Sequence, residues 1–235
     1  MNILLTGATG MVGRGVLLEA LDHPEVTSVL SIGRRPSGVE HPKLEEIVRD
    51  DFEDLGDIAD RFATIDACLW CLGISSVGIL DADYARITYD YTMATARALH
   101  AQNPEARFCY VSGAGTDSSE QGRIRWARVK GKTENDLKKI GFRGVTLFRP
   151  GLIRPMRGIV PNDRLQKILY TLLTPILPLL QKLHLTTSTD ALGRAMIAAG
   201  MGRVREGMLG NREINEVGGG GRMNRETEME GRISP

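Results

Sequence analysis

Three glycines at three-residue spacing stand near the start of the chain. Gly7, Gly10 and Gly13 belong to the segment TGATGMVG, which follows a short apolar run and precedes a helical pattern. At such a junction glycine permits a tight turn and lets the backbone approach a diphosphate, while the first amides of the helix donate to phosphate oxygens. The segment therefore predicts a dinucleotide-binding loop rather than an ordinary strand-to-helix turn. The candidate contacts in it are Thr6, Gly7, Thr9, Gly10, Met11, Val12 and Gly13.

The end of the second predicted strand indicates which dinucleotide is bound. The chain there reads Ser31-Ile32-Gly33-Arg34-Arg35, without an acid to accept a hydrogen bond from a ribose 2′-hydroxyl. Guanidinium groups instead match phosphate oxygens, so Arg34 and Arg35 favour NADP over NAD. The plainer interpretation is that both arginines are solvated loop cations.

Short apolar runs alternate with longer helical segments along the first 150 residues. That alternation is typical of βαβ units that wind a parallel sheet. The predicted fold class is therefore α/β, a Rossmann-type doubly wound parallel sheet. We expect strands at residues 2–5, 26–32, 44–49, 67–72, 107–112 and 144–148, and helices at 12–21, 84–101 and 123–140, with a weaker helix at 54–62.

The pattern changes after residue 148. The segment RPGLIRPMRG is rich in proline and glycine, and residues 163–185 are largely apolar but interrupted at Pro175. We expect a small C-terminal helical cap at about 151–187 that walls a substrate pocket. A membrane-surface segment at 165–185 is the alternative, which two prolines and few basic residues disfavour.

The rest of the C-terminal part divides into a helix and a tail. Residues 188–200 begin with hydroxyl side chains and carry an apolar face, which predicts a capped helix returning to the core. We therefore expect the NAD(P)-binding domain to cover residues 1–205. Residues 211–235 show no apolar periodicity and are expected to form a disordered tail.

Composition limits the classes of partner. The 235 residues are 42% apolar, and 30 lysines and arginines balance 29 acids to give a net charge of +1. That balance gives no bulk attraction to nucleic acid or to an anionic membrane, so the expected partner is a small-molecule substrate, and a homodimer stays open. Three cysteines, an odd number, suit a reducing compartment, and we expect a cytoplasmic protein.

Several motifs together resemble the short-chain dehydrogenase/reductase superfamily, in its atypical and extended branch of epimerase/dehydratase-like NAD(P)-binding proteins. The resemblance covers about residues 1–200. It implies NADP(H)-dependent oxidation or reduction, or epimerase-type chemistry, on a small carbonyl or alcohol substrate. The segments that carry it are TGATGMVG, Asp51-Phe52, Leu72-Gly73, YVSGAG at 110–115, WARVKGKTENDL at 126–137 and RPG at 149–151.

The resemblance also implies roles for single positions. Asp51 would hold the adenine amino group, and Leu72 and Gly73 would line the nicotinamide side. Ser112 would be the active-site hydroxyl, and Lys130 would bind the nicotinamide ribose. The other positions expected to contact the cofactor are Phe52, Pro150 and Gly151.

One position departs from the family pattern. The family's acid/base is a tyrosine four residues before the lysine, and here Trp126 stands at that position. An indole N–H donates a hydrogen bond but does not release a proton near neutral pH, so Trp126 cannot replace the phenol as a general acid.

Three interpretations follow from Trp126. In the first, the protein is an oxidoreductase whose proton comes from water or from Tyr84, Tyr89 or Tyr91. In the second, it is an NADP-binding sensor or regulatory protein without turnover. In the third, the chain has kept only the fold, since a fold does not establish a function.

The remaining candidates have plainer explanations. Cys68 and Cys71 have redox spacing but lie in a predicted strand, where core packing is the better interpretation. The four histidines lack metal-ligand spacing, so no metal is assigned. Ser112 is not inside a G-x-S-x-G motif, which disfavours a hydrolase. Arg14 suits either a pyrophosphate contact or a surface position.

Overall fold

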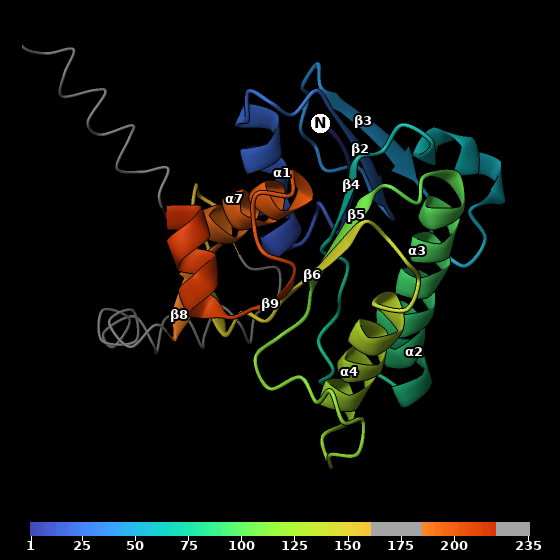
Figure 1. Cartoon of the computed structure of the whole chain (residues 1–235), viewed down its shortest axis with the longest axis vertical. Helices are drawn as coiled ribbons and strands as arrows, with labels where there is room; N and C mark the ends of the chain where they lie inside the picture. The colour runs from blue at the N-terminus through green and yellow to red at the C-terminus, as the bar shows by residue number, and fades with distance from the viewer. Residues whose placement is uncertain (161–184, 220–235) are drawn as a thin grey trace, which may run out of the picture.

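The core of the molecule is a parallel sheet, seen in a computed structural model that describes residues 1–160 and 185–219 (Figure 1). Within those residues the main sheet has seven strands in the order β3-β2-β1-β4-β5-β6-β9. The first six confirm the expected strands, whereas β9 was not expected. The strands are β1 (Asn2–Thr6), β2 (Ser28–Gly33), β3 (Leu44–Val48), β4 (Ala67–Trp70), β5 (Arg107–Val111), β6 (Gly144–Phe148) and β9 (Gly207–Leu209).

The strand order has a switch point beside β1. The chain moves outward from β1 through β2 to β3, then returns to place β4 on the other side of β1. Leu5 of β1 is aligned with Ser31 of β2 and with Leu69 of β4. In an open parallel sheet a crevice forms at this point, outside the carboxyl ends of the strands. The doubly wound Rossmann-type fold is therefore confirmed.

Helices cover both faces of the sheet, which explains why its central strands are continuous apolar runs. One face packs against α1 (Met11–Asp22) and α7 (Thr189–Gly200), and the other against η1 (Gly56–Phe62), α3 (Tyr91–Gln102) and α4 (Arg125–Leu137) (Figure 1). A short helix, α2 (Asp81–Ala85), continues through a π-helical turn, η2 (Arg86–Asp90), into α3.

A small second sheet lies beside the main one. It pairs β7 (Leu152–Arg154) with β8 (Thr186–Ser188) in parallel, and β8 leads directly into α7. The Ser188 hydroxyl accepts the Ala191 N–H at 3.4 Å, which confirms the expected capped helix. At both described ends of the expected helical cap (151–187) the chain thus forms short strands rather than helices. Residues 161–184, which include the apolar centre of that segment, lie outside the described residues.

The expected disordered tail is wrong at its start. Residues 211–219 are helical. Ile214 is fully buried in the core beside α7, and the Gly218 carbonyl oxygen accepts a hydrogen bond of 2.5 Å from Nε of Arg194. Ile214, Val217 and Gly218 lie at helical spacing against the core, but two apolar side chains among charged and polar neighbours give too weak a period to predict a helix from the sequence. Residues 220–235 lie outside the described part of the chain.

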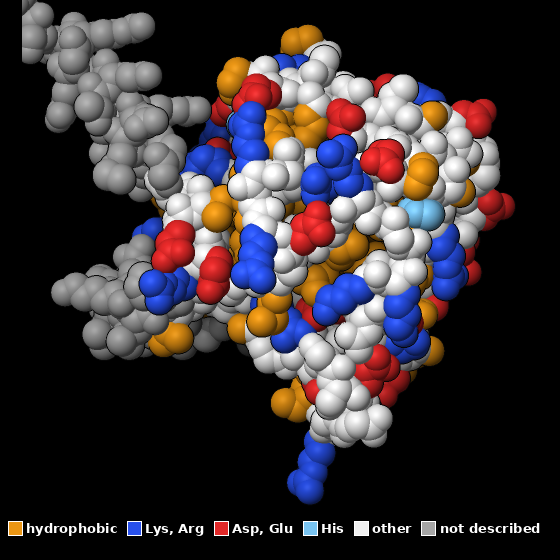
Figure 2. Space-filling model, in the orientation of Figure 1, with side chains coloured by type: hydrophobic (Ala, Val, Ile, Leu, Met, Phe, Trp, Pro, Cys, Tyr) orange, Lys and Arg blue, Asp and Glu red, His pale blue; other side chains and the backbone are white. Residues whose placement is uncertain are grey.

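Basic and acidic side chains are interspersed on the face seen in Figure 2, as the balanced composition predicts. Within residues 1–160 and 185–219, we find no helix of the length and hydropathy that crossing a bilayer requires.

Candidate functional site

A cavity of about 740 Å³ opens at the switch point of the sheet. It lies between the loop after β1, the end of β2, the loop after β4, the end of β5, the middle of α4 and the start of β7. Most of the predicted site residues line it. These are Gly7, Thr9, Gly10, Met11, Val12, Gly13, Arg34, Arg35, Leu72, Gly73, Ser112, Lys130 and Gly151.

The glycine loop has the backbone geometry that a diphosphate site needs. Gly7 adopts a φ of +73°, and a Cβ there would lie 2.6 Å from the Cys71 carbonyl oxygen. A Cβ at Gly13 would overlap the Gly7 carbonyl oxygen, so α1 packs on the loop only because position 13 has no side chain. Gly10 is the N-cap of α1 without a side-chain cap, and the first turn contains no acid. The amino end of α1 is thus suited to an anion.

Arg34 and Arg35 line the cavity where β2 ends, and both are exposed. Arg14 lies beside the loop, and its Nη1 donates to the Ser37 carbonyl oxygen at 2.7 Å. Arg34 and Arg35 thus place two guanidinium groups at one end of the cavity, where a phosphate would be matched in charge, while Arg14 lines an adjoining hollow.

Ser112 lies at the opposite end of the cavity and is buried. Its N–H donates to the Phe148 carbonyl oxygen at 2.7 Å, which fixes its position between β5 and β6. Its Oγ lies 2.9 Å from Oγ1 of Thr116, which donates its own hydrogen to the Gly113 carbonyl oxygen at 2.8 Å. Because Thr116 has one hydroxyl hydrogen, Ser112 is the donor in this pair.

Lys130 reaches the cavity from α4. Its Nζ donates to the Val111 carbonyl oxygen at 3.2 Å and lies 5.2 Å from the centre of the Tyr110 ring. Desolvation by burial lowers the pKa of Lys130 to about 8, and the Glu134 carboxylate opposes this shift.

Glu134 does not form an ion pair with Lys130, although it follows one helical turn later. Its fully buried carboxylate accepts hydrogen bonds from Nε of Arg149 at 2.9 Å and from Nη2 of the same arginine. Arg149 also donates to the Ser118 hydroxyl at 2.5 Å. This bidentate pair fixes α4 to the end of β6, two residues before Gly151 of the cavity lining.

Trp126 packs beside the loop after β5 rather than in the cavity lining. Its ring atoms would lie 3.8 Å from a Cβ at Gly113 and 3.6 Å from one at Gly115. The tryptophan therefore supports the backbone next to Ser112, and it offers no titratable proton there.

Tyr84, Tyr89 and Tyr91, considered above as proton donors, do not line the cavity. Tyr84 is buried beneath the guanidinium of Arg125. The Tyr89 hydroxyl donates to Asp136 at 2.8 Å, and Tyr91 stacks on Phe52 with ring centroids 5.4 Å apart. Each is already engaged elsewhere, so the structure does not support these three as donors.

Four expected contacts lie outside the lining. The Thr6 hydroxyl accepts the Leu72 N–H at 3.2 Å, and the Pro150 carbonyl oxygen accepts the Ala114 N–H at 2.8 Å. Both hold loops that border the cavity. Asp51 is exposed, and its carboxylate accepts the Glu53 N–H at 2.9 Å. Phe52 is buried in the hydrophobic core, where its ring packs against the rings of Trp70 and Tyr91.

Cys68 and Cys71 lie in different surroundings. Cys68 is buried, as expected, and burial raises its pKa. Cys71 instead lines the cavity, with its Sγ 4.0 Å from Sδ of Met196, and burial raises its pKa as well. The two thiols thus lie on opposite faces and do not form a redox pair.

Sequence reasoning missed part of the site. Glu134 and Arg149 stood in quoted motifs, but their pairing depends on α4 meeting the end of β6, which no local pattern encodes. Thr116 lacked any signal. The other lining residues that were not selected are Ala8, Ser31, Gly33, Cys71, Ile74, Ser75, Val111, Leu152 and Ile153.

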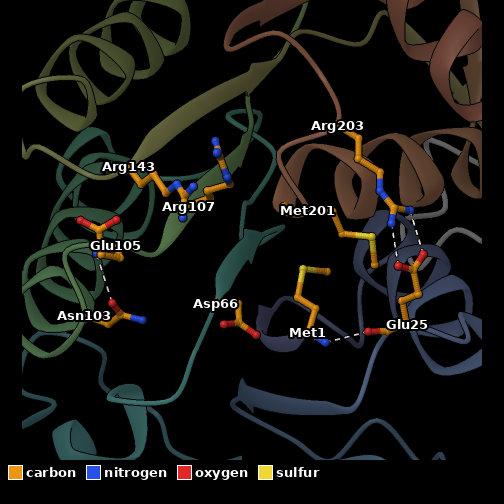
Figure 3. A pocket seen from close by; sticks show the side chains of 10 residues that line it. Met1, Glu25, Asp66, Asn103, Glu105, Arg107, Arg143, Met201 and Arg203 are labelled. Atoms are coloured by element: carbon orange, nitrogen blue, oxygen red, sulfur yellow. Dashed lines mark hydrogen bonds and ion pairs between the residues drawn. The ribbon is translucent and has the colours of Figure 1, made fainter.

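A second hollow, of about 440 Å³, lies at the opposite end of the sheet (Figure 3). Three of its charged side chains form ion pairs. Arg203 donates to both carboxylate oxygens of Glu25, at 2.6 and 2.8 Å, and the Met1 amino group donates to the Glu25 carbonyl oxygen at 2.6 Å. Arg107 pairs with Glu206. This hollow lies at the amino ends of the strands, where open parallel sheets do not bind their ligands.

The sequence profile of a family described as NAD(P)H-binding matches residues 7–152, which contain the glycine loop, Ser112 and Lys130. The protein named FMP52, mitochondrial, of Meyerozyma guilliermondii is 28% identical over 159 residues, 65% of this chain and 65% of that protein. The protein HTATIP2 of Rattus norvegicus is 27% identical over 154 residues, 65% of this chain and 62% of that protein. The chain thus spans just under two thirds of the length of these curated relatives.

Solved structures share the fold at low identity. MoeE5 in complex with UDP-glucose and NAD superposes with a TM-score of 0.67 at 17% identity, covering 89% of this chain and 75% of that one. Uronate dehydrogenase from Agrobacterium tumefaciens superposes with a TM-score of 0.64 at 18% identity, covering 89% of this chain and 76% of that one.

Proposed function

Because the chain belongs to the NAD(P)H-binding family, we propose that it uses NADP(H) to reduce or oxidise a small carbonyl or alcohol substrate. The observation that carries this proposal is the composition of a single cavity. One end holds the glycine loop and the arginines, and the other end holds Ser112 and Lys130.

The preference for NADP over NAD rests on Arg34 and Arg35. A 2′-phosphate at the end of β2 would be within a region that presents two exposed guanidinium groups. Glu46 of the neighbouring strand β3 is an acid that could accept a hydrogen bond from a ribose 2′-hydroxyl, but its carboxylate already accepts the Ser37 N–H at 2.9 Å. The variant Arg34→Ala/Arg35→Ala should weaken NADPH binding at least about ten-fold and leave NADH binding nearly unchanged. Equal losses for both nucleotides would remove the support for an NADP preference.

The residues at the inner end would orient the reacting groups. Lys130 would hold the nicotinamide ribose, and Ser112 would polarise the substrate oxygen after its hydroxyl turns away from Thr116. Gly151 also lines the cavity, and it packs closely on Asn211, because a Cβ at position 151 would lie 2.9 Å from Nδ2 of that residue. The bound nucleotide would supply or accept the hydride.

The loop after β4 favours a substrate with an apolar substituent. Ile74 lines the cavity, and Val77 and Leu80 on the same loop are each 74% exposed. Exposed Ile124 lies nearby, because its neighbour Arg125 pairs with Asp81 and donates to the Ser76 carbonyl oxygen. Ile74 puts an apolar side chain in the cavity lining, and the exposed apolar side chains that follow it on the same loop are of the kind found at binding surfaces.

An NADP-binding sensor without turnover is the second candidate. The position of Trp126 favours it, because an indole packs beside Ser112 where the resembling enzymes have a phenol. The two candidates differ in one measurement. NADPH oxidation over a panel of aliphatic and aromatic aldehydes and ketones supports an oxidoreductase, whereas tight binding without oxidation of any of them supports a sensor.

We place the protein in a reducing compartment because its three cysteines are free thiols, two of them buried. The cytoplasm remains our proposal. The word mitochondrial in the fungal relatives' names describes those proteins, and fractionation of cells that express a tagged chain distinguishes the two compartments.

A further inference from the structure

The cavity contains few groups that could supply a proton. Among the described residues that line it, titratable side chains are limited to Arg34, Arg35, Cys71 and Lys130. The arginines lie at the end of β2, away from Ser112, and guanidinium groups do not release protons near neutral pH. Burial raises the pKa of Cys71, whose thiol contacts Met196. Lys130 is the remaining candidate beside Ser112.

The surroundings of Lys130 leave its ammonium available. One N–H of the ammonium donates to the Val111 carbonyl oxygen, and no carboxylate among the described residues lies within ion-pair distance of Nζ. The groups that face it are Glu134 on its own helix and Tyr110 on β5, with Arg149 behind Glu134. Arg149 engages both oxygens of Glu134, so the nearest acid on α4 is already neutralised. An ammonium that is desolvated without a direct counter-ion becomes a stronger acid.

We propose that Lys130 is the general acid of this chain, donating a proton to the substrate oxygen during carbonyl reduction in place of the tyrosine missing at position 126. This inference rests on the proposed function. The carbonyl carbon gains the hydride of the reduced nicotinamide nucleotide, and the π electrons of the carbonyl move to its oxygen. That oxygen then takes one proton from the ammonium, which leaves an alcohol, the oxidised nucleotide and a neutral amine. Water returns the proton to the amine.

The pKa of Lys130 gives this role a working range. A pKa of about 8 keeps the ammonium charged at pH 7 and makes it a better acid than an ordinary lysine. Reduction should therefore proceed below pH 8 and slow as pH rises through that value. Oxidation of the alcohol needs the neutral amine and should show the opposite dependence.

The first test compares two lysine variants with a matched control. Lys130→Arg keeps the positive charge but cannot release a proton, and Lys130→Met removes both. We expect both to retain NADPH binding within about ten-fold and to lose at least about 100-fold in the rate of carbonyl reduction. Lys138→Arg, an exposed position on the same segment, should behave as the wild type. A Lys130→Arg protein with an unchanged rate overturns the inference.

A second test needs no turnover. In protein labelled with ¹³C at lysine Cε, the resonance missing from Lys130→Arg identifies Lys130, and its midpoint is read from a pH titration in the presence of NADP⁺. A midpoint near 8 supports the inference, and one at 10 or above overturns it. The rate in single-turnover reduction should fall with the same midpoint.

A rescue variant separates proton donation from a structural role. Trp126→Tyr/Lys130→Arg restores a phenol beside a cation, so it should recover at least about ten-fold of the rate that Lys130→Arg loses. Tyr170 lies outside the described residues and is the alternative proton donor to be tested. The variant Tyr170→Phe should keep the midpoint of the pH dependence near 8. Loss of that midpoint in Tyr170→Phe overturns the assignment to Lys130. A wild-type protein that binds NADPH but reduces no carbonyl contradicts the proposed function itself, whereas an active wild type with an equally active Lys130→Arg contradicts only the role of Lys130.

Discussion

Lys130 and Glu134 lie one turn apart on α4, yet Glu134 pairs with Arg149 at the end of β6 and not with Lys130. Residues four apart on a helix are neighbours, so this lysine and this acid could have formed a surface-type pair. The tertiary contact with Arg149 prevents it. Lys130 therefore lies at the inner end of the candidate site without a direct counter-ion, and burial lowers its pKa to about 8.

The buried pair itself should matter for stability. Arg149→Met leaves the fully buried Glu134 carboxylate without its partner, which should cost about 3–5 kcal/mol in the free energy of unfolding. Glu134→Gln/Arg149→Met should cost clearly less, because no unpaired charge remains. Urea denaturation of both single variants and the double variant measures the coupling. Additive losses would show that the two side chains act independently.

Burial of Lys130 predicts how stability depends on pH. The folded-state pKa of about 8 lies below the ordinary lysine pKa of 10.5, so the folded protein binds fewer protons than the unfolded chain between these values. The cost of burying the ammonium is therefore fully present below pH 8 and disappears as pH rises toward 10.5. It amounts to at most about 3 kcal/mol.

The variant Lys130→Met isolates that cost. Its stability advantage over the wild type should be larger at pH 7 than at pH 10.5, by up to about 3 kcal/mol. Denaturant titrations of the two proteins at both pH values provide the comparison. A difference that does not change with pH would mean that Lys130 titrates alike in the folded and unfolded chains.

Close packing of the glycine loop gives a third prediction. In Gly13→Ala the new methyl group overlaps the Gly7 carbonyl oxygen, so α1 must move away from the loop. We expect a loss of about 3 kcal/mol in unfolding free energy, together with loss of NADPH binding. Gly73→Ala is the control for stability, since a Cβ there meets nothing within 4 Å. Unchanged stability in Gly13→Ala would contradict the packing described.

The variant Trp126→Tyr tests the departure from the family pattern. A phenol one turn before Lys130 would face a cation that lowers its pKa and would add a second acid near Ser112. We expect carbonyl reduction to rise at least about ten-fold, measured as NADPH oxidation at saturating cofactor. If the rate does not rise, the missing phenol does not limit turnover in this chain.

Strong local patterns made much of this structure predictable. The runs at Ile3 to Leu5 and Ala67 to Trp70 are buried on both faces, and their continuous apolar character already indicated central parallel strands. The glycine loop could be predicted because each of its glycines stands where a Cβ would collide with the backbone, in a fixed order of strand, turn and helix.

Features that depend on contacts between residues far apart in the chain could not be predicted from the sequence. Strand β9 is three residues long and is defined only by its pairing with β6. Asp51 and Phe52 were assigned by position in a motif, but the local backbone turns one toward solvent and the other into the core. The resemblance identified Lys130, whereas its lack of a counter-ion emerges only when α4 packs beside β6.

Calorimetric titration of the purified protein with NADPH measures whether a dinucleotide binds at the amino end of α1, on which the proposed activity and the role of Lys130 both depend. We predict saturable binding at one site per chain, with NADH binding more weakly and Gly13→Ala not binding. A correctly folded protein that releases no heat and shows no binding with either nucleotide would contradict this prediction.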